Sequence, residues 1–160
     1  MGRLREATPR LAPRLAGTLV ADVQAIGAGR RGHTLPFDLA FHRVLPDPAL
    51  SLAFCCRREA GGYPLEPRLV IVGPKSKPSL CMFEPGYEMA AVRLKLEWVA
   101  PLLDLVPSEH EGAVTDLSLM LAGFAEPLFG KLLETRIPER AVAMLAAALV
   151  QRRHRDPACE

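Results

Sequence analysis

The sequence of 160 residues has no apolar run long enough to span a membrane. A transmembrane helix needs about 18 or more consecutive apolar residues, and no stretch approaches that length. Residues 1–14 also lack the continuous apolar core of a secretory signal peptide. We therefore expect a cytoplasmic protein that makes no contact with a membrane.

An excess of charge is also missing, since 20 Lys and Arg residues face 18 Asp and Glu residues, a net charge of +2. Such a small imbalance creates no strong field for nucleic acid. The basic residues Arg152, Arg153 and Arg155 are expected to form a solvated helix end, where they oppose the negative end of the helix dipole. Apolar residues make up 49% of the chain, which indicates a globular domain with a substantial core.

The four cysteines show no Cys-x-x-Cys spacing. Neighbouring Cα atoms such as those of Cys55 and Cys56 lie about 3.8 Å apart, which is shorter than the usual disulfide range of about 4.4–6.8 Å. On a strand these two side chains would point to opposite faces of the sheet. We expect Cys55, Cys56, Cys81 and Cys159 to be small, mostly buried and reduced.

Motifs for catalysis, metal binding and phosphate binding are scarce. The string Gly27–Gly32 matches GxGxxG, but Pro36 prevents the long helix that a dinucleotide site requires. Gly73–Lys77 lacks the P-loop spacing, and Pro74 has no N–H to offer, so we predict a turn that ends a strand. No GxSxG elbow occurs. The histidines lack the paired spacing of a barrel metal site; they are His33, His42, His110 and His154. The chain is predicted to be no enzyme and to hold no metal or cofactor.

The first half of the chain is typical of β structure, because short apolar runs are broken regularly by Gly or Pro. Glu84–Tyr87 (Glu-Pro-Gly-Tyr) predicts a type II turn that joins two strands into a hairpin. Arg57–Arg68 is expected to be an exposed loop. The predicted strands are Gly17–Ile26, Leu39–Leu45, Leu50–Cys55, Leu69–Val72, Leu80–Glu84 and Met89–Leu96.

From Glu97 onward the pattern becomes helical. Trp98–Leu105 predicts a short helix, and Thr115–Thr135 predicts a long one that Pro127 must kink or restart. Pro138 suits the first position of a final helix. Ala141–Val150 is apolar nearly all round, so this helix must be buried in its own core or against a second subunit. The long helix shows one apolar face, formed by Leu117, Leu121, Phe124, Leu128 and Leu132.

These patterns together predict an α+β fold, namely a small β-barrel or sandwich followed by two or three C-terminal helices. We expect a single domain over residues 1–160. Its β-rich part covers residues 17–96, and its helical part covers residues 97–155.

Several stretches resemble the N-terminal domain of AraC/XylS-type transcription regulators. Arg43–Asp47 (Arg-Val-Leu-Pro-Asp) is similar to an element that precedes a strand in that family. Val72–Pro78 is similar to its Gly-Pro turn with a basic residue, and Ala91–Lys95 to its Gly-Val-Arg-Phe segment. Ala100–Pro107 and Val114–Leu117 resemble its short helix and the start of its long helix. The resemblance runs from about Phe41 to Arg155.

The resemblance implies a cupin-like barrel that binds an effector, and C-terminal helices that join two subunits into a homodimer. It also implies a DNA-binding domain with two helix-turn-helix units, which is absent from this chain and would follow Glu160. The effector is then a small molecule, and DNA is contacted only through that further domain. Candidate ligand-binding residues are His42, Phe54, Met82 and Arg93. Candidate interface residues are Phe124, Val142, Leu145 and Leu149.

Two alternatives remain beside this hypothesis. A cupin-like small-molecule-binding protein or enzyme would share the fold, and the enzyme would need a stoichiometric metal. A stand-alone protein-interaction module would bind no small ligand, so no small molecule would raise its melting temperature.

Overall fold

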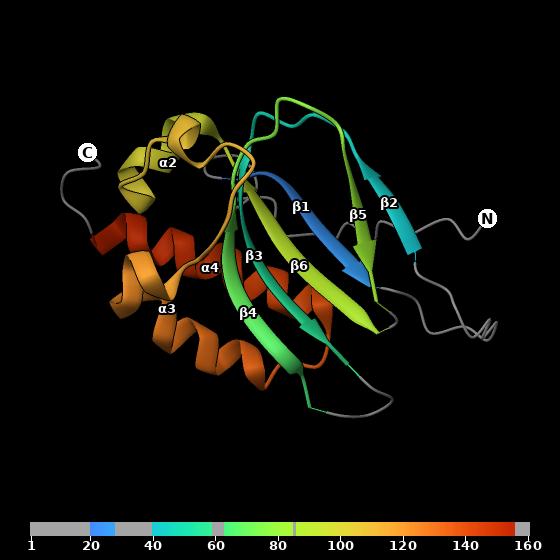
Figure 1. Ribbon diagram of the computed structural model, residues 1–160. Coiled ribbons are helices and arrows are strands. Elements are labelled where there is room, and N and C mark those ends of the chain that lie inside the picture. Colours follow the sequence, from blue (N-terminus) through green and yellow to red (C-terminus); the bar gives the residue numbers. More distant parts are fainter. Residues whose placement is uncertain (1–19, 28–39, 59–62, 85, 156–160) are drawn as a thin grey trace.

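The computed structural model describes residues 20–27, 40–58, 63–84 and 86–155 (Figure 1). None of the helices within these ranges is both long and apolar enough to cross a membrane. The GxGxxG string Gly27–Gly32 lies outside these ranges except for Gly27. The elements in chain order are β1 (Val20–Gly27), β2 (Ala40–Val44), β3 (Leu50–Arg57), β4 (Leu65–Val72), β5 (Ser79–Phe83), β6 (Tyr87–Leu94), α2 (Leu96–Leu103), the 3-10 helix η1 (Pro107–His110), β7 (Val114–Asp116), α3 (Ser118–Leu133) and α4 (Pro138–Arg155).

The strands form two antiparallel sheets. Five strands pair in the order β1-β6-β3-β4-β7, and β2 pairs with β5 in a separate two-stranded sheet. Helices α3 and α4 lie on one side of the larger sheet, and β2 and β5 lie on the other (Figure 1). The α+β class is therefore confirmed. The described strands do not close into a barrel.

The residues of β3 alternate between the two sides of the larger sheet, as the pleat requires. Leu52, Phe54 and Cys56 belong to the core beneath the helices. Ala53 and Cys55 belong to a smaller cluster on the opposite side. The expectation that Cys55 and Cys56 face opposite ways is thus confirmed.

Helix α4 covers the sheet, packing mainly on β6 and β1. Its side chains Val142, Leu145 and Leu149 are fully buried within the single chain. The sequence left open whether this apolar helix is covered by its own domain or by a second subunit. The structure shows that these three side chains are covered by the chain's own core.

The turn at Glu84–Tyr87 forms as predicted, but the hairpin does not. The N–H of Tyr87 donates to the carbonyl oxygen of Glu84 at 3.1 Å, and Gly86 has φ +80°. However, β5 pairs with β2, whereas β6 pairs with β1 and β3. The prediction of a hairpin was wrong because the chain changes sheets at this turn.

Two further boundaries differ from the prediction. β3 extends to Arg57 and β4 begins at Leu65, so the expected loop Arg57–Arg68 is partly strand. Val114–Asp116 pairs with β4 as the edge strand β7, and the helix begins only at Ser118. The non-helical residue inside α3 is Leu121 (φ −137°, ψ 56°), more than one turn before Pro127. The interruption of α3 is therefore at Leu121, and Pro127 lies inside the helix.

The turn predicted at Gly73–Lys77 is confirmed, because β4 ends at Val72. A Cβ atom at Gly73 would lie 1.7 Å from the carbonyl oxygen of His110. The N–H of Gly73 donates to the carbonyl oxygen of Ala113 at 2.9 Å. Only glycine allows the backbone of η1 to approach this closely.

Replacing Leu145 with Ala removes a fully buried side chain from the core. We expect a loss of about 2–5 kcal/mol in the free energy of unfolding, measured with urea. The matched control is Leu119→Ala, since the Leu119 side chain is 82% exposed. The control is expected to change stability by less than about 0.5 kcal/mol. Equal effects of the two substitutions would contradict the placement of Leu145 in the core.

Asp116 is the last residue of β7, and its side chain binds Ser118, the first residue of α3. Its Oδ1 accepts hydrogen bonds from the Ser118 hydroxyl at 2.6 Å and the Ser118 N–H at 2.9 Å. These two bonds lower the pKa of Asp116 below its ordinary value. We expect Asp116→Ala to cost about 0.5–1 kcal/mol at pH 7, because both hydrogen bonds are exposed to solvent.

The sign of the pH dependence follows from the lowered pKa of Asp116. The stabilisation is complete above the carboxyl pKa of the unfolded chain, about 3.9, and is lost as the pH falls through the lower folded pKa. Urea unfolding at pH 7 and at stepwise lower pH should show that the difference in unfolding free energy between wild type and variant decreases. Glu126→Ala, at an exposed residue, serves as the control. An increase in the difference between wild type and the Asp116 variant toward acid pH would contradict the stabilising role of the Asp116 carboxylate.

Candidate functional site

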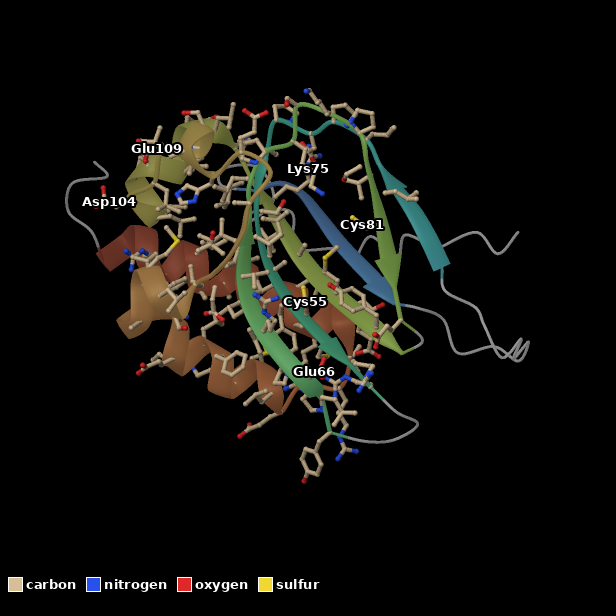
Figure 2. The ribbon with its side chains drawn as sticks, viewed as in Figure 1. Cys55, Glu66, Lys75, Cys81, Asp104 and Glu109 are labelled. Atoms are coloured by element: carbon tan, nitrogen blue, oxygen red, sulfur yellow. The ribbon has the colours of Figure 1, made fainter. Side chains whose placement is uncertain are left out.

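The side of the larger sheet that faces away from the helices carries Arg93, Tyr87 and the Cys55 thiol. Small apolar side chains form its floor, namely Ala53, Val70 and Ala91, with Cys55, Val72 and Met89 packed around them. Ala53, Val70 and Ala91 are buried, and we call this side the open face because α3 and α4 cover the opposite side. Cys81 on β5 and Cys55 on β3 are shown in Figure 2, together with Lys75 on the connection between β4 and β5.

One end of the open face is organised around Asp47. The Asp47 N–H donates to the carbonyl oxygen of Lys75 at 2.9 Å, and the Lys75 N–H donates to the carbonyl oxygen of Asp47 at 2.7 Å. Nη2 of Arg93 lies 2.6 Å from Oδ1 of Asp47. The same oxygen accepts from the N–H of Ala49 at 2.9 Å. We call Asp47, Lys75 and Arg93 the Asp47 junction.

The position of Arg93 follows from the register of β6. Arg93 lies opposite Ser51 of β3, and its neighbours Val92 and Leu94 are buried on the helix side. Its side chain therefore projects toward the open face. The side chains of Arg93 and Asp47 are 27% and 36% exposed, so the ion pair contributes about 0–1 kcal/mol. The ion pair therefore serves more to fix geometry than to stabilise the fold.

Two weak acids lie at the other end of the open face. Burial raises the pKa of the Cys55 thiol, and a hydrogen bond to Tyr87 offsets part of this rise. Burial also raises the pKa of Tyr87, and the neighbouring thiols of Cys55, Cys56 and Cys81 raise it further. Both groups are therefore protonated at neutral pH. Cys55 is a poor nucleophile in this state, and the pair offers uncharged hydrogen-bonding groups instead.

The four predicted ligand-binding residues do not form one group. Arg93 faces the open face. Phe54 faces the helices, where its ring packs edge-to-face on Phe129 with the ring centroids 6.2 Å apart. His42 pairs with Cys81 and Met82 with Phe41 across the two-stranded sheet, but the side chains of His42 and Met82 lie outside the described part.

The four predicted interface residues are also separated. Val142, Leu145 and Leu149 lie in the core, while Phe124 is only half-buried. Phe124 lines an open groove of about 720 Å³ between α3 and α4. Of the four, Phe124 is therefore the one that a second molecule is able to reach.

Sequence reasoning did not single out Asp47, Cys55 or Tyr87 as site residues. The strand period of two was the signal that could have found Tyr87, since Tyr87, Met89, Ala91 and Arg93 lie on the same side of β6. The contact between Asp47 and Arg93 had no such signal, because 46 positions separate them in the chain.

The described residues contain no group of three or more His, Cys, Asp or Glu side chains arranged to hold a metal ion. Cys55, Cys56 and Cys81 are free thiols. Comparison of the chain with protein families, curated proteins and solved structures found no match.

The raised pKa of Cys55 predicts slow alkylation. Iodoacetamide reacts with the thiolate, so the half-maximal rate at Cys55 should occur at a higher pH in the folded protein than in urea. Tyr87→Phe removes a hydrogen bond that lowers the pKa, and should shift this midpoint further upward. Peptide mapping by mass spectrometry across a pH series measures both. A midpoint that is equal in folded and unfolded protein would contradict the burial of this thiol.

Proposed function

We propose that the chain is the effector-sensing and dimerisation domain of an AraC/XylS-type transcription regulator, with its two sheets in a cupin-like arrangement. The observation that carries the proposal is the Asp47 junction. Three stretches resemble the family, Arg43–Asp47, Val72–Pro78 and Ala91–Lys95, and each contributes one residue to this junction.

The junction gives a physical reason for the residue types in these stretches. Asp47 supplies a carboxylate that binds both the Arg93 guanidinium and the Ala49 N–H. Lys75 joins Asp47 through its backbone, and its Nζ donates to the Ser79 hydroxyl at 3.0 Å, at the start of β5. The connections next to β2 and β5 are thus tied to β6 of the larger sheet. The resemblance therefore coincides with the contacts that hold the two sheets together at one end.

The open face is where we place the effector. Its floor consists largely of small apolar side chains, and polar groups lie at both ends, Arg93 at one and Tyr87 at the other. Most ligand sites in proteins combine an apolar lining with a few placed polar groups. An effector with an acidic group would suit Arg93, since arginine binds carboxylates well.

The strand β6 provides a physical link from the effector to the helices. Arg93 projects to the open face, while Val92 and Leu94 on the same strand belong to the core shared with α4. A ligand shifts an equilibrium only when it binds two states with different affinity. We infer that the effector favours one position of β6, and through it one arrangement of the helical layer.

A fusion protein tests the proposal. Residues 1–160 are placed before a DNA-binding domain that represses a reporter gene only as a dimer. We expect repression by the fusion and none by the DNA-binding domain alone, because the sensing domain supplies the dimer contact. A panel of small organic acids should contain a compound that alters repression. Arg93→Met should remove this response while repression persists, and the exposed Arg140→Met should leave both unchanged.

The gene provides an independent arm of the same test. Its sequence after the codon for Glu160 should encode two helix-turn-helix units. A stop codon at that point, together with a folded fusion protein that fails to repress, would overturn the proposed function.

A further inference from the structure

The side chain of Arg58 joins the larger sheet to the helical layer. Arg58 directly follows β3, and its Nε donates to Oε2 of Glu88 on β6 at 2.7 Å. Its Nη2 donates to the carbonyl oxygen of Thr135, in the connection between α3 and α4, at 2.5 Å. One guanidinium therefore holds a strand and a helix connection together. We call these two bonds the Arg58 bridge.

The Arg58 bridge is held at its backbone and is largely shielded from water. The Arg58 N–H donates to the carbonyl oxygen of Gly86 at 2.8 Å, and a Cβ atom at Gly86 would lie 2.4 Å from the carbonyl oxygen of Arg58. The side chains of Arg58 and Glu88 are 10% and 27% exposed. A planar guanidinium presents its donors in a fixed geometry, so it suits two acceptors at set positions. The bridge therefore fixes the position of Glu88 relative to Thr135.

Thr135 connects its end of the bridge to both helices. Its N–H donates to the carbonyl oxygen of Leu132 at 3.0 Å, at the end of α3. Its hydroxyl oxygen lies 3.2 Å from the carbonyl oxygen of Lys131 and 3.1 Å from Sδ of Met144 on α4. Thr135 is also buried, with 6% exposure. A displacement of the Thr135 carbonyl is therefore passed on to the end of α3 and to α4.

Glu88 connects the other end of the bridge to the open face. Glu88 follows Tyr87 on β6, and consecutive strand residues point to opposite sides of a sheet. Glu88 lies opposite Cys56, which belongs to the core beneath the helices, whereas Tyr87 belongs to the open face. A displacement of the backbone at Tyr87 therefore moves Glu88 on the helical side.

We propose that the Arg58 bridge transmits the effector signal from β6 to the connection between α3 and α4. An effector that displaces β6 at Tyr87 moves Glu88, so that Arg58 can no longer hold Glu88 and Thr135 together. A buried carbonyl that loses its donor is costly, which favours a bridge that is either complete or broken. The inference rests on the proposed function, because it assigns the route by which the same effector site acts on the helices. Arg58 acts as a positioning residue in this route.

A competing route exists through the apolar core. Val92 and Leu94 of β6 share that core with α4, and they would pass on a displacement without Arg58. The two routes differ in one respect. If the bridge carries the signal, a change at Tyr87 reaches the α3–α4 connection only when Arg58 is present.

Amide hydrogen exchange in the complete chain tests this dependence without a ligand. The reporters are the N–H groups of Thr135, Arg140 and Ala141, which donate to backbone carbonyls at both ends of the connection. Tyr87→Ala imitates a displacement of β6. We expect it to speed exchange at these amides about three- to tenfold when Arg58 is present, and less than about 1.5-fold in the Arg58→Met background.

Arg57→Met is the matched control. Arg57 is the neighbouring arginine, lies opposite Tyr87 in the register, and its Nη1 donates to Glu84 at 2.8 Å. In this background Tyr87→Ala should keep its full effect on the three amides. Circular dichroism verifies folding, and Tyr87→Phe, which removes only the hydroxyl, repeats the comparison with a milder change.

The fusion protein described above extends the test to regulation. Arg58→Lys retains the positive charge, but a single amine cannot reproduce the fork of a guanidinium. We expect repression in the absence of acid to stay within about twofold of wild type. The organic acid that alters repression by the wild-type fusion should still raise Tm, because it still binds, but should no longer alter repression. Arg57→Lys should retain both the rise in Tm and the response.

Two results would overturn the proposal. One is an equal acceleration of exchange by Tyr87→Ala with Arg58 and with Met at that position, which would assign the signal to Val92 and Leu94. The other is unchanged exchange at the three amides when Tyr87 is replaced and Arg58 is present. A wild-type fusion that fails to repress would instead count against the proposed function. Because exchange is measured on the chain without the fusion, the two failures are distinguishable.

Discussion

The structure depends on the central strand β3, which is buried on both sides of the larger sheet. Leu50, Leu52 and Phe54 have at most 3% exposure beneath the helices, and Ala53 between them is equally buried on the other side. The strand pairs with β4 along one edge and β6 along the other. Because a shift of one residue would exchange the two faces, the register of β3 is strongly fixed, and both layers take their positions from it.

The two sides of the sheet have different chemistry, because the register of β3 fixes which residues face each side. The helical side contains large aliphatic side chains that exclude water, and α4 completes it with Leu145 and Leu149. The open face carries smaller side chains, with ionic and hydrogen-bonding groups at its ends, such as Arg93 and Tyr87. Stability is therefore concentrated on the helical side, while the other side retains groups that are able to recognise a ligand. We regard this division as the physical basis of the proposed sensing function.

The connections contribute contacts that join separate parts of the chain. Asp47 ties the segment after β2 to the turn after β4 and to β6. Arg58 makes a comparable link on the helical side, where its Nε donates to Glu88 at 2.7 Å and its Nη2 donates to the carbonyl oxygen of Thr135 at 2.5 Å. Both links involve β6, which lies between the open face and the helical layer and is joined through Arg58 to the connection between α3 and α4. A strand with these contacts is well placed to couple the two layers.

The sequence alone determined the α+β class, the approximate positions of β1 to β6 and the start of α4 at Pro138, because local periodicity and proline placement record these features. It also determined the turn at Gly86, whose positive φ favours glycine. Only the tertiary structure decided that β5 leaves β6 to pair with β2, that Phe54 and Arg93 face opposite ways, and that Val142, Leu145 and Leu149 are covered within one chain. These features depend on which distant segments meet, and local patterns do not encode the partner of a strand or the surface that covers a helix.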